Sequence, residues 1–109
     1  MQSINGKKIT LTKGDTFKAI VTMVDPTGQE YTPQSGDVVR FAMKQDYSDP
    51  SVLVEKTIPN DSLLLTLDSE DTHSLEAGGY VYDIQITYAN GDVDTFIDRG
   101  ILMLTEEVD

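Results

Sequence analysis

The residue types that perform most nucleophilic catalysis are scarce in this chain. His73 is the single histidine among 109 residues, cysteine is absent, and no serine lies in a G-x-S-x-G motif. A nucleophile needs an adjacent base, and a histidine beside Asp71 and Thr72 supplies only half of such a pair. We interpret His73 as a surface or helix-capping residue. The sequence therefore predicts a protein that is not an enzyme, with no catalytic residue.

Carboxylates form two clusters, Asp68, Glu70 and Asp71 in one and Asp92, Asp94 and Asp98 in the other. Asp92 and Asp94 lie two residues apart in an expected strand, so they share a face and could bind one cation with additional ligands. The spacing does not match a D-x-D-x-D-G calcium loop, and two-carboxylate glycoside hydrolysis would need a cleft. We interpret these groups as solvated surface carboxylates, so we expect no metal and no other cofactor.

The tyrosines fall into two groups. Tyr80, Tyr82 and Tyr88 alternate with polar residues at strand spacing, which is typical of the buried face of a sheet. The segment before Tyr80 also suits a corner at which its buried hydroxyl bonds back to the loop. Tyr31 and Tyr47 lie in expected loops, where an aromatic ring either anchors a partner or pins its own loop. Both are candidate partner-binding residues.

The charge is strongly acidic and unevenly distributed. The net charge is −11, and residues 68–109 carry 11 acids against Arg99 alone. Such a charge repels phosphate backbones and anionic lipid, so we expect neither nucleic acid nor a membrane as partner. Within the first 18 residues, Lys7, Lys8, Lys13 and Lys18 face only Asp15 and form a basic edge, which predicts head-to-tail contacts with an acidic surface. Lys7, Lys8 and Lys13 are the other candidate partner-binding residues.

Period-two alternation of polar and apolar residues dominates the chain and predicts strands. We expect them at residues 8–12, 17–24, 38–44, 52–58, 63–67, 80–88, 93–97 and 101–104, with residues 29–32 as a short return. A type I turn is expected at 25–28, and one helical turn at 68–75, capped by Asp68 or Ser69. The prediction is an all-β fold, an antiparallel immunoglobulin-like β-sandwich of seven to eight short strands. It forms one domain over residues 1–109, with 105–109 as a frayed tail.

The last hairpin gives the clearest local signal. Asn90-Gly91 is the favoured pair for a two-residue type I′ turn. Such a turn fixes the register, pairing Tyr88 with Val93, Ile86 with Thr95 and Ile84 with Ile97. Asp98-Arg99-Gly100 then predicts a β-bulge, because glycine tolerates the backbone that a bulge requires.

Four segments carry a resemblance to a known group of proteins: residues 11–17 (LTKGDTF), 36–44 (GDVVRFAMK), 75–84 (LEAGGYVYDI) and the hairpin 88–95. Their order resembles small β-sandwich proteins of bacteriophages and prophages, in particular the N-terminal domain of phage upper baseplate and related tail-associated proteins. The resemblance covers nearly the whole chain. It implies a virion structural component that docks on other tail proteins, often as a homo-oligomer.

That resemblance leads to two expectations. The baseplate proteins continue into a linker and a distal domain, whereas this chain stops at Asp109, so we expect a stand-alone assembly subunit. The first residues form no apolar leader, so we expect assembly in the bacterial host cytoplasm and residence in the virion. The alternative is an immunoglobulin-like module that binds carbohydrate or protein through loops carrying Tyr31 or Tyr47.

Overall fold

The described part of the chain is an all-β structure of two sheets with one short helix. The computed structural model describes residues 2–4, 8–23 and 28–106, with the backbone alone for residues 2–4 and 97–99. Its elements are β1 (Gln2–Ile4), β2 (Lys8–Thr12), β3 (Phe17–Val21), β4 (Val38–Lys44), β5 (Val54–Ile58), β6 (Leu64–Leu67), α1 (Ser69–His73), β7 (Gly78–Thr87) and β8 (Val93–Thr105). The expected all-β class and the single helical turn are confirmed.

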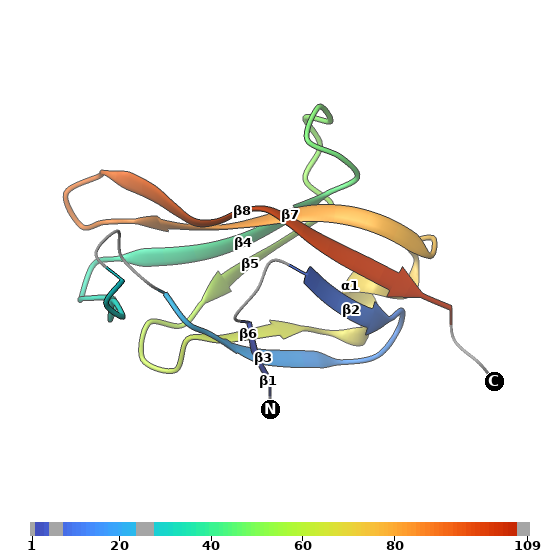
Figure 1. The fold of residues 1–109 in the computed structure, drawn as a ribbon, viewed down its shortest axis with the longest axis horizontal. Coiled ribbons are helices and arrows are strands. Elements are labelled where there is room, and N and C mark those ends of the chain that lie inside the picture. The colour runs from blue at the N-terminus through green and yellow to red at the C-terminus, as the bar shows by residue number, and fades with distance from the viewer. Residues whose placement is uncertain (1, 5–7, 24–27, 107–109) are drawn as a thin grey trace.

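The two sheets contain five and three strands. The larger has the order β2-β8-β7-β4-β5 and the smaller the order β1-β3-β6, and Figure 1 shows the two layers. Two pairs, β1 with β3 and β2 with β8, are parallel, so the expectation of an entirely antiparallel arrangement was wrong. Alternation of side chains sets which face a strand buries, but it carries no information about the direction of the neighbouring strand.

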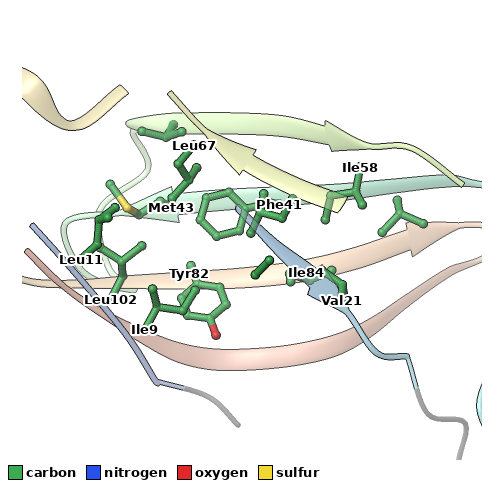
Figure 2. Packing of buried hydrophobic residues seen from close by; sticks show 14 of the residues in the cluster. Ile9, Leu11, Val21, Phe41, Met43, Ile58, Leu67, Tyr82, Ile84 and Leu102 are labelled. Atoms are coloured by element: carbon green, nitrogen blue, oxygen red, sulfur yellow. The ribbon is translucent and has the colours of Figure 1, made fainter. Parts of the chain in front are cut away.

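The core lies between the sheets and follows the period of two. In β4, Val39, Phe41 and Met43 are fully buried, and Phe41 packs on the ring of Tyr82 from β7 at 5.3 Å between centroids. Figure 2 shows Phe41, Met43 and Tyr82 in the layer between the sheets, together with Val21 and Leu67 of the smaller sheet. The predicted burial of the β7 stripe is confirmed for Tyr80, Tyr82, Ile84 and Ile86, whereas Tyr88 is half-buried.

The turn of the last hairpin differs from the expected type. The N–H of Gly91 donates to the carbonyl of Tyr88, and the N–H of Tyr88 donates to the carbonyl of Asp92. Asn90 does not have the positive φ of a type I′ turn, whereas Gly91 does, with φ +95°. The loop therefore has three residues, and Gly91 provides the left-handed position.

This longer loop shifts the predicted register by one residue near the turn. Thr87, rather than Tyr88, lies opposite Val93, and Gln85, rather than Ile86, lies opposite Thr95. An irregularity then restores the predicted pairing of Ile84 with Ile97.

A bulge next to Gly100 is confirmed. Between the pairs Tyr82–Gly100 and Ile84–Ile97, β8 has one residue more than β7. A Cβ at Gly100 would overlap the ring of Tyr82, so the glycine leaves space for that ring against β8.

Two local hydrogen bonds fix the segment between β6 and β7, which contains α1. The hydroxyl of Tyr80 donates to the carbonyl of Glu76 at 2.6 Å, which confirms the predicted corner. Asp68 is the N-cap of α1, and its N–H donates to Oδ2 of Asp71 at 2.7 Å.

Other predicted boundaries move by one or two residues or fall outside the described part. Val52 and Leu53 belong to the loop before β5, and Thr105 ends β8 rather than opening a tail. The N–H of Tyr31 donates to the carbonyl of Met23, so the segment 29–32 does return beside the preceding chain. Residues 25–27 of the expected turn and residues 107–109 of the expected tail lie outside the described residues.

Candidate functional site

One end of the molecule is formed by three loops that carry acids and no bases. These loops are residues 28–37, 59–63 and 88–94, which we call the acidic loop end, and their acids are Glu30, Asp37, Asp61, Asp92 and Asp94. Figure 1 shows the loops together at the left, at one end of an axis of 45 Å. No lysine or arginine occurs within them, so the surface here has one sign of charge.

Asp37 joins the three loops. Its Oδ2 accepts from the hydroxyl of Tyr31 at 2.7 Å and from the N–H of Gln34 at 2.8 Å. Its Oδ1 accepts from the N–H of Ala89 at 3.1 Å, and its carbonyl accepts from Nδ2 of Asn60 at 2.7 Å. The acidic loop end is therefore a connected surface rather than three independent loops.

These bonds shift the titration of both partners. The N–H of Gln34 and the hydroxyl of Tyr31 stabilise the carboxylate and hold the pKa of Asp37 below its ordinary value. The same hydrogen bond to Asp37 raises the pKa of Tyr31 to about 12, with burial adding to the effect. The pair is thus a neutral phenol bound to an ionised carboxylate across the neutral pH range.

Tyr31 is one of the predicted partner-binding residues, and the structure gives it an internal role. Its half-buried ring meets Tyr88 edge-on at 5.8 Å and stacks on Phe96 at 6.2 Å. Both the ring and the hydroxyl are engaged within the acidic loop end.

The role of Asp37 was missed at the sequence level, although a signal was present. Residues 37, 39, 41 and 43 fall on the same face by alternation, and Val39, Phe41 and Met43 are apolar. A carboxylate at the start of that buried face needs internal donors, because an unsatisfied buried acid is costly. Asp37 is indeed buried.

The predicted basic edge is described only in part. Lys7 lies outside the described residues, Lys8 is exposed at the start of β2, and Lys13 is half-exposed after the end of β2. Lys18, on β3, is exposed; it belonged to the predicted edge but not to the candidate partner-binding residues. Lys8, Lys13 and Lys18, here called the lysine edge, form no ion pair within the described part of the chain.

A groove of about 610 Å³ lies at the lysine edge. Its lining comes from the end of β2, the following turn and the start of β3: Thr10, Leu11, Thr12, Asp15, Thr16, Phe17 and Lys18. In Figure 1 this turn lies at the right, at the opposite end from the acidic loops. Asp15 and Lys18 are the charged residues of the lining, and Lys8 and Lys13 lie nearby at the two ends of β2.

The same end of the molecule carries acids on α1, and these are partly neutralised. Nζ of Lys56 lies 2.8 Å from Oδ2 of Asp71 and 3.5 Å from Oδ2 of Asp68. The hydrogen bond to Asp71 raises the pKa of Lys56, so the lysine stays charged. The first carboxylate cluster is therefore part of an ion-pair network at the helix start, which the sequence pattern did not reveal.

Tyr47, the other tyrosine predicted to bind a partner, lies on a loop that projects from the larger sheet (Figure 1). Its side chain is 53% exposed, and Val52 and Leu53 on the same loop are also exposed. Oδ1 of Asp46 accepts from the N–H and the hydroxyl of Ser48, at 2.8 and 2.6 Å. The loop thus holds apolar side chains outward on an internally bonded turn.

His73 and the second carboxylate cluster complete the survey of predicted chemistry. His73 is exposed at the last residue of α1, where a surface residue was expected. Oδ2 of Asp94 accepts from the hydroxyl of Tyr88 at 2.9 Å, and Asp92 is exposed. The side chain of Asp98 lies outside the described part. Among described residues, no three acidic or histidine side chains are grouped to hold a metal ion.

Two further findings concern membrane spans and similarity to known proteins. Within the described residues, no helix has the length and apolar character needed to cross a bilayer. Neither a scan against protein-family models nor a search of curated proteins gives a match.

Proposed function

We propose that the protein is a non-enzymatic structural subunit of a phage or prophage virion, associated with the tail or baseplate. It acts through protein–protein contacts between copies or with neighbouring tail proteins. The observation that carries this proposal is that the acidic loop end and the turn between β2 and β3, beside the lysine edge, lie on opposite sides of the molecule. Acidic loops on one side and unpaired lysines toward the other favour head-to-tail association over pairing of like surfaces.

The finer fold assignment belongs to the same proposal. We infer an immunoglobulin-like sandwich, supported by the tyrosine corner at Tyr80 and by the two packed sheets. The parallel pairing of β2 with β8 is compatible with it, since an early strand can cross to the sheet that contains the last one. The segments of the chain that resemble phage tail-associated domains include this corner.

Solution mass tests the proposed function directly. Light scattering behind size exclusion, at low and at physiological salt, should show an oligomer that loosens as salt screens the charges. The variant Lys7→Glu/Lys8→Glu/Lys13→Glu should be monomeric at both salts and should melt as the wild type does. Lys44→Glu, on β4 and away from the groove lining, is the control for a change of lysine charge alone.

Equal masses for the wild type and the triple variant at both salts would contradict the proposal. A wild-type monomer under all conditions would also contradict self-assembly. It would favour the second candidate described next.

The second candidate is a binding module that acts through its loops. Exposure of Tyr47, Val52 and Leu53 on one projecting loop favours it, because apolar and aromatic side chains recur at the centres of interfaces. Under this proposal Tyr47→Ala abolishes binding to a carbohydrate or protein ligand, whereas lysine substitutions at β2 leave binding unchanged. A ligand that binds wild type and Tyr47→Ala equally would exclude it.

A further inference from the structure

We propose that the groove between β2 and β3 binds an extended acidic peptide segment of a neighbouring subunit, which adds to the open edge of β2 as a further strand. The inference rests on the proposed assembly function and names the kind of segment that the lysine edge receives. Strand addition of this kind uses backbone hydrogen bonds for affinity and alternate side chains for specificity.

The first step is the direction of the backbone groups of β2. The N–H of Lys13 donates to the carbonyl of Thr105, so the polar groups of alternate residues, including Leu11, face β8. Those of Thr10 consequently face away from β8, because neighbouring residues of a strand point their backbone groups to opposite sides. In the described part of the chain, β2 has no second strand on that side.

The second step is the start of β3. The N–H of Val21 donates to the carbonyl of Leu63, so the backbone groups of Lys18 point away from β6 by the same alternation. On that side β1 pairs only with residues 19–21, and Lys18 lies before this stretch. The groove is therefore lined by the unpaired edge of β2 and by a stretch of β3 that β1 does not cover.

The third step is that the closed end of the groove is fixed in advance. The N–H of Gly14 donates to Oγ1 of Thr72 at 2.9 Å, and Thr72 is fully buried. The N–H of Asp15 donates to the carbonyl of Thr12 at 3.1 Å. A preformed site pays less ordering free energy on binding than a site that must assemble around its ligand.

The fourth step is the chemistry of the lining. Leu11 is buried and Phe17 is half-buried, so alternate side chains of an added strand find an apolar surface. Side chains on the other face of that strand lie on the same side of the larger sheet as Lys8, while Lys18 lines the groove from β3. Neither these two lysines nor the nearby Lys13 is ion-paired in the described structure. Alternation of apolar and acidic residues is therefore the complementary pattern.

The lysines also exclude one competing occupant. Two copies of β2 meeting edge to edge would bring Lys8 and Lys13 of one copy toward those of the other. Like charges on an edge strand oppose such pairing, as edge lysines do in many sheets. An acidic segment of a neighbouring subunit is not repelled in this way.

The experiment uses fluorescein-labelled peptides with the intact protein. The probe is a peptide of alternating valine and glutamate, long enough to span β2, and the readout is fluorescence anisotropy at two salt concentrations. We expect saturable binding that weakens with salt. A valine–lysine peptide should bind at least about tenfold more weakly, because the attraction between charges is lost. A valine–glutamate peptide with alternate amides N-methylated should also bind at least about tenfold more weakly, because backbone hydrogen bonds are lost.

Two variants of the protein place the site. Lys18→Glu should weaken the valine–glutamate peptide about tenfold, and Lys44→Glu should not. Thr10→Pro removes the outward N–H of β2 and should weaken binding while the β2–β8 pairing remains. Should Thr10→Pro fail to fold, amide NMR of the wild type gives the same information, with peptide-dependent shifts expected along β2 and residues 16–18.

The proposal is overturned by equal binding to wild type and Lys18→Glu, by shifts confined to β5, or by undiminished binding of the N-methylated peptide. Failure of this inference and of the proposed function can be told apart. Salt-sensitive oligomers without peptide binding overturn the groove proposal alone. Peptide binding by a protein that never self-associates supports the groove and contradicts self-assembly.

Discussion

The carboxylate of Asp37 accepts a hydrogen bond from the backbone N–H of Ala89, 52 residues later in the chain, at 3.1 Å. The bond ties the tip of the β7–β8 hairpin to the loop that precedes β4. Close approach of the same segments needs Gly36, which has φ +93° and where a Cβ would lie 2.9 Å from that of Ala89. A side chain at this position would conflict with both the backbone conformation and the contact.

Asp37→Asn should lower the melting temperature at neutral pH, because the acceptor charge for three hydrogen bonds is lost. The folded pKa of Asp37 is lowered, so its contribution is fully present above the ordinary pKa of about 3.9. It is lost as the pH falls through the lower, folded value. Calorimetry should therefore find a constant difference between the two proteins down to about pH 4 and a shrinking one below. Glu30→Gln, an exposed acid of the same end, is the control.

The difference in stability between wild type and Tyr31→Phe should depend on pH in the opposite direction, decreasing at alkaline pH. The folded pKa of Tyr31 is raised from 10.0 to about 12, so the stability from its hydroxyl is complete below pH 10.0 and is lost as pH rises toward 12. The difference in melting temperature between wild type and Tyr31→Phe should narrow over this interval. Tyr82 also has a pKa of about 12, because of burial, but its ionisation affects both proteins. A difference that persists unchanged above the interval would contradict the assigned bond.

Tyr82→Phe and Tyr80→Phe remove the same atom and should change stability in opposite directions. The hydroxyl of Tyr82 is buried and has no hydrogen-bond partner among the described residues, so its removal should stabilise the fold by about 1 kcal/mol. The hydroxyl of Tyr80 donates to Glu76, and its removal should cost about 1 kcal/mol. Urea unfolding of both variants tests the pair. A loss of stability in Tyr82→Phe would mean that its hydroxyl is satisfied in solution.

Gly100→Ala should destabilise the protein by about 1–3 kcal/mol, because the added methyl group overlaps the ring of Tyr82. Gly79→Ala is the matched control on the neighbouring strand. There the nearest atom is Sδ of Met103 at 3.4 Å, at the flexible end of a side chain, so the cost should be small. Gly100→Ala should cost less in a Tyr82→Leu background than in the wild type, because the overlapping ring is gone. Denaturant midpoints of the wild type, the three single variants and the double variant form the test.

The sequence was most informative where a rule is local. Alternation identified the buried residues of β4 and β7, and the segment 75–80 identified the corner at Tyr80. The predicted turn type was wrong because Asn90-Gly91 is compatible with both a two-residue and a three-residue loop. The choice between the two loops depends on packing beyond the hairpin. The bulge near Gly100 was predicted, but its cause, the ring of Tyr82 lying over the glycine, is a contact between strands.

The candidate surfaces were predicted less completely because they combine distant segments. The groove that Lys18 lines is formed by β2, the following turn and β3, whose two strands belong to different sheets. Tyr31 was a candidate partner-binding residue, and its internal bond to Asp37 and ring contacts with Tyr88 and Phe96 were not predicted. Periodicity describes one strand at a time and cannot predict contacts between residues that are far apart in the sequence.

The parallel pairing of β2 with β8 has a consequence for how the chain folds. The side chains of Thr12 and Thr105 meet across 93 residues of sequence, at the end of this pairing. A contact of such long range forms late and slows folding, because nearly the whole chain must be ordered to make it. During synthesis, β2 leaves the ribosome early but finds its partner strand only when residues 101–105 have emerged. A chain arrested before that point lacks the strand on which β2 depends, and β2 is then an exposed target for chaperones and proteases.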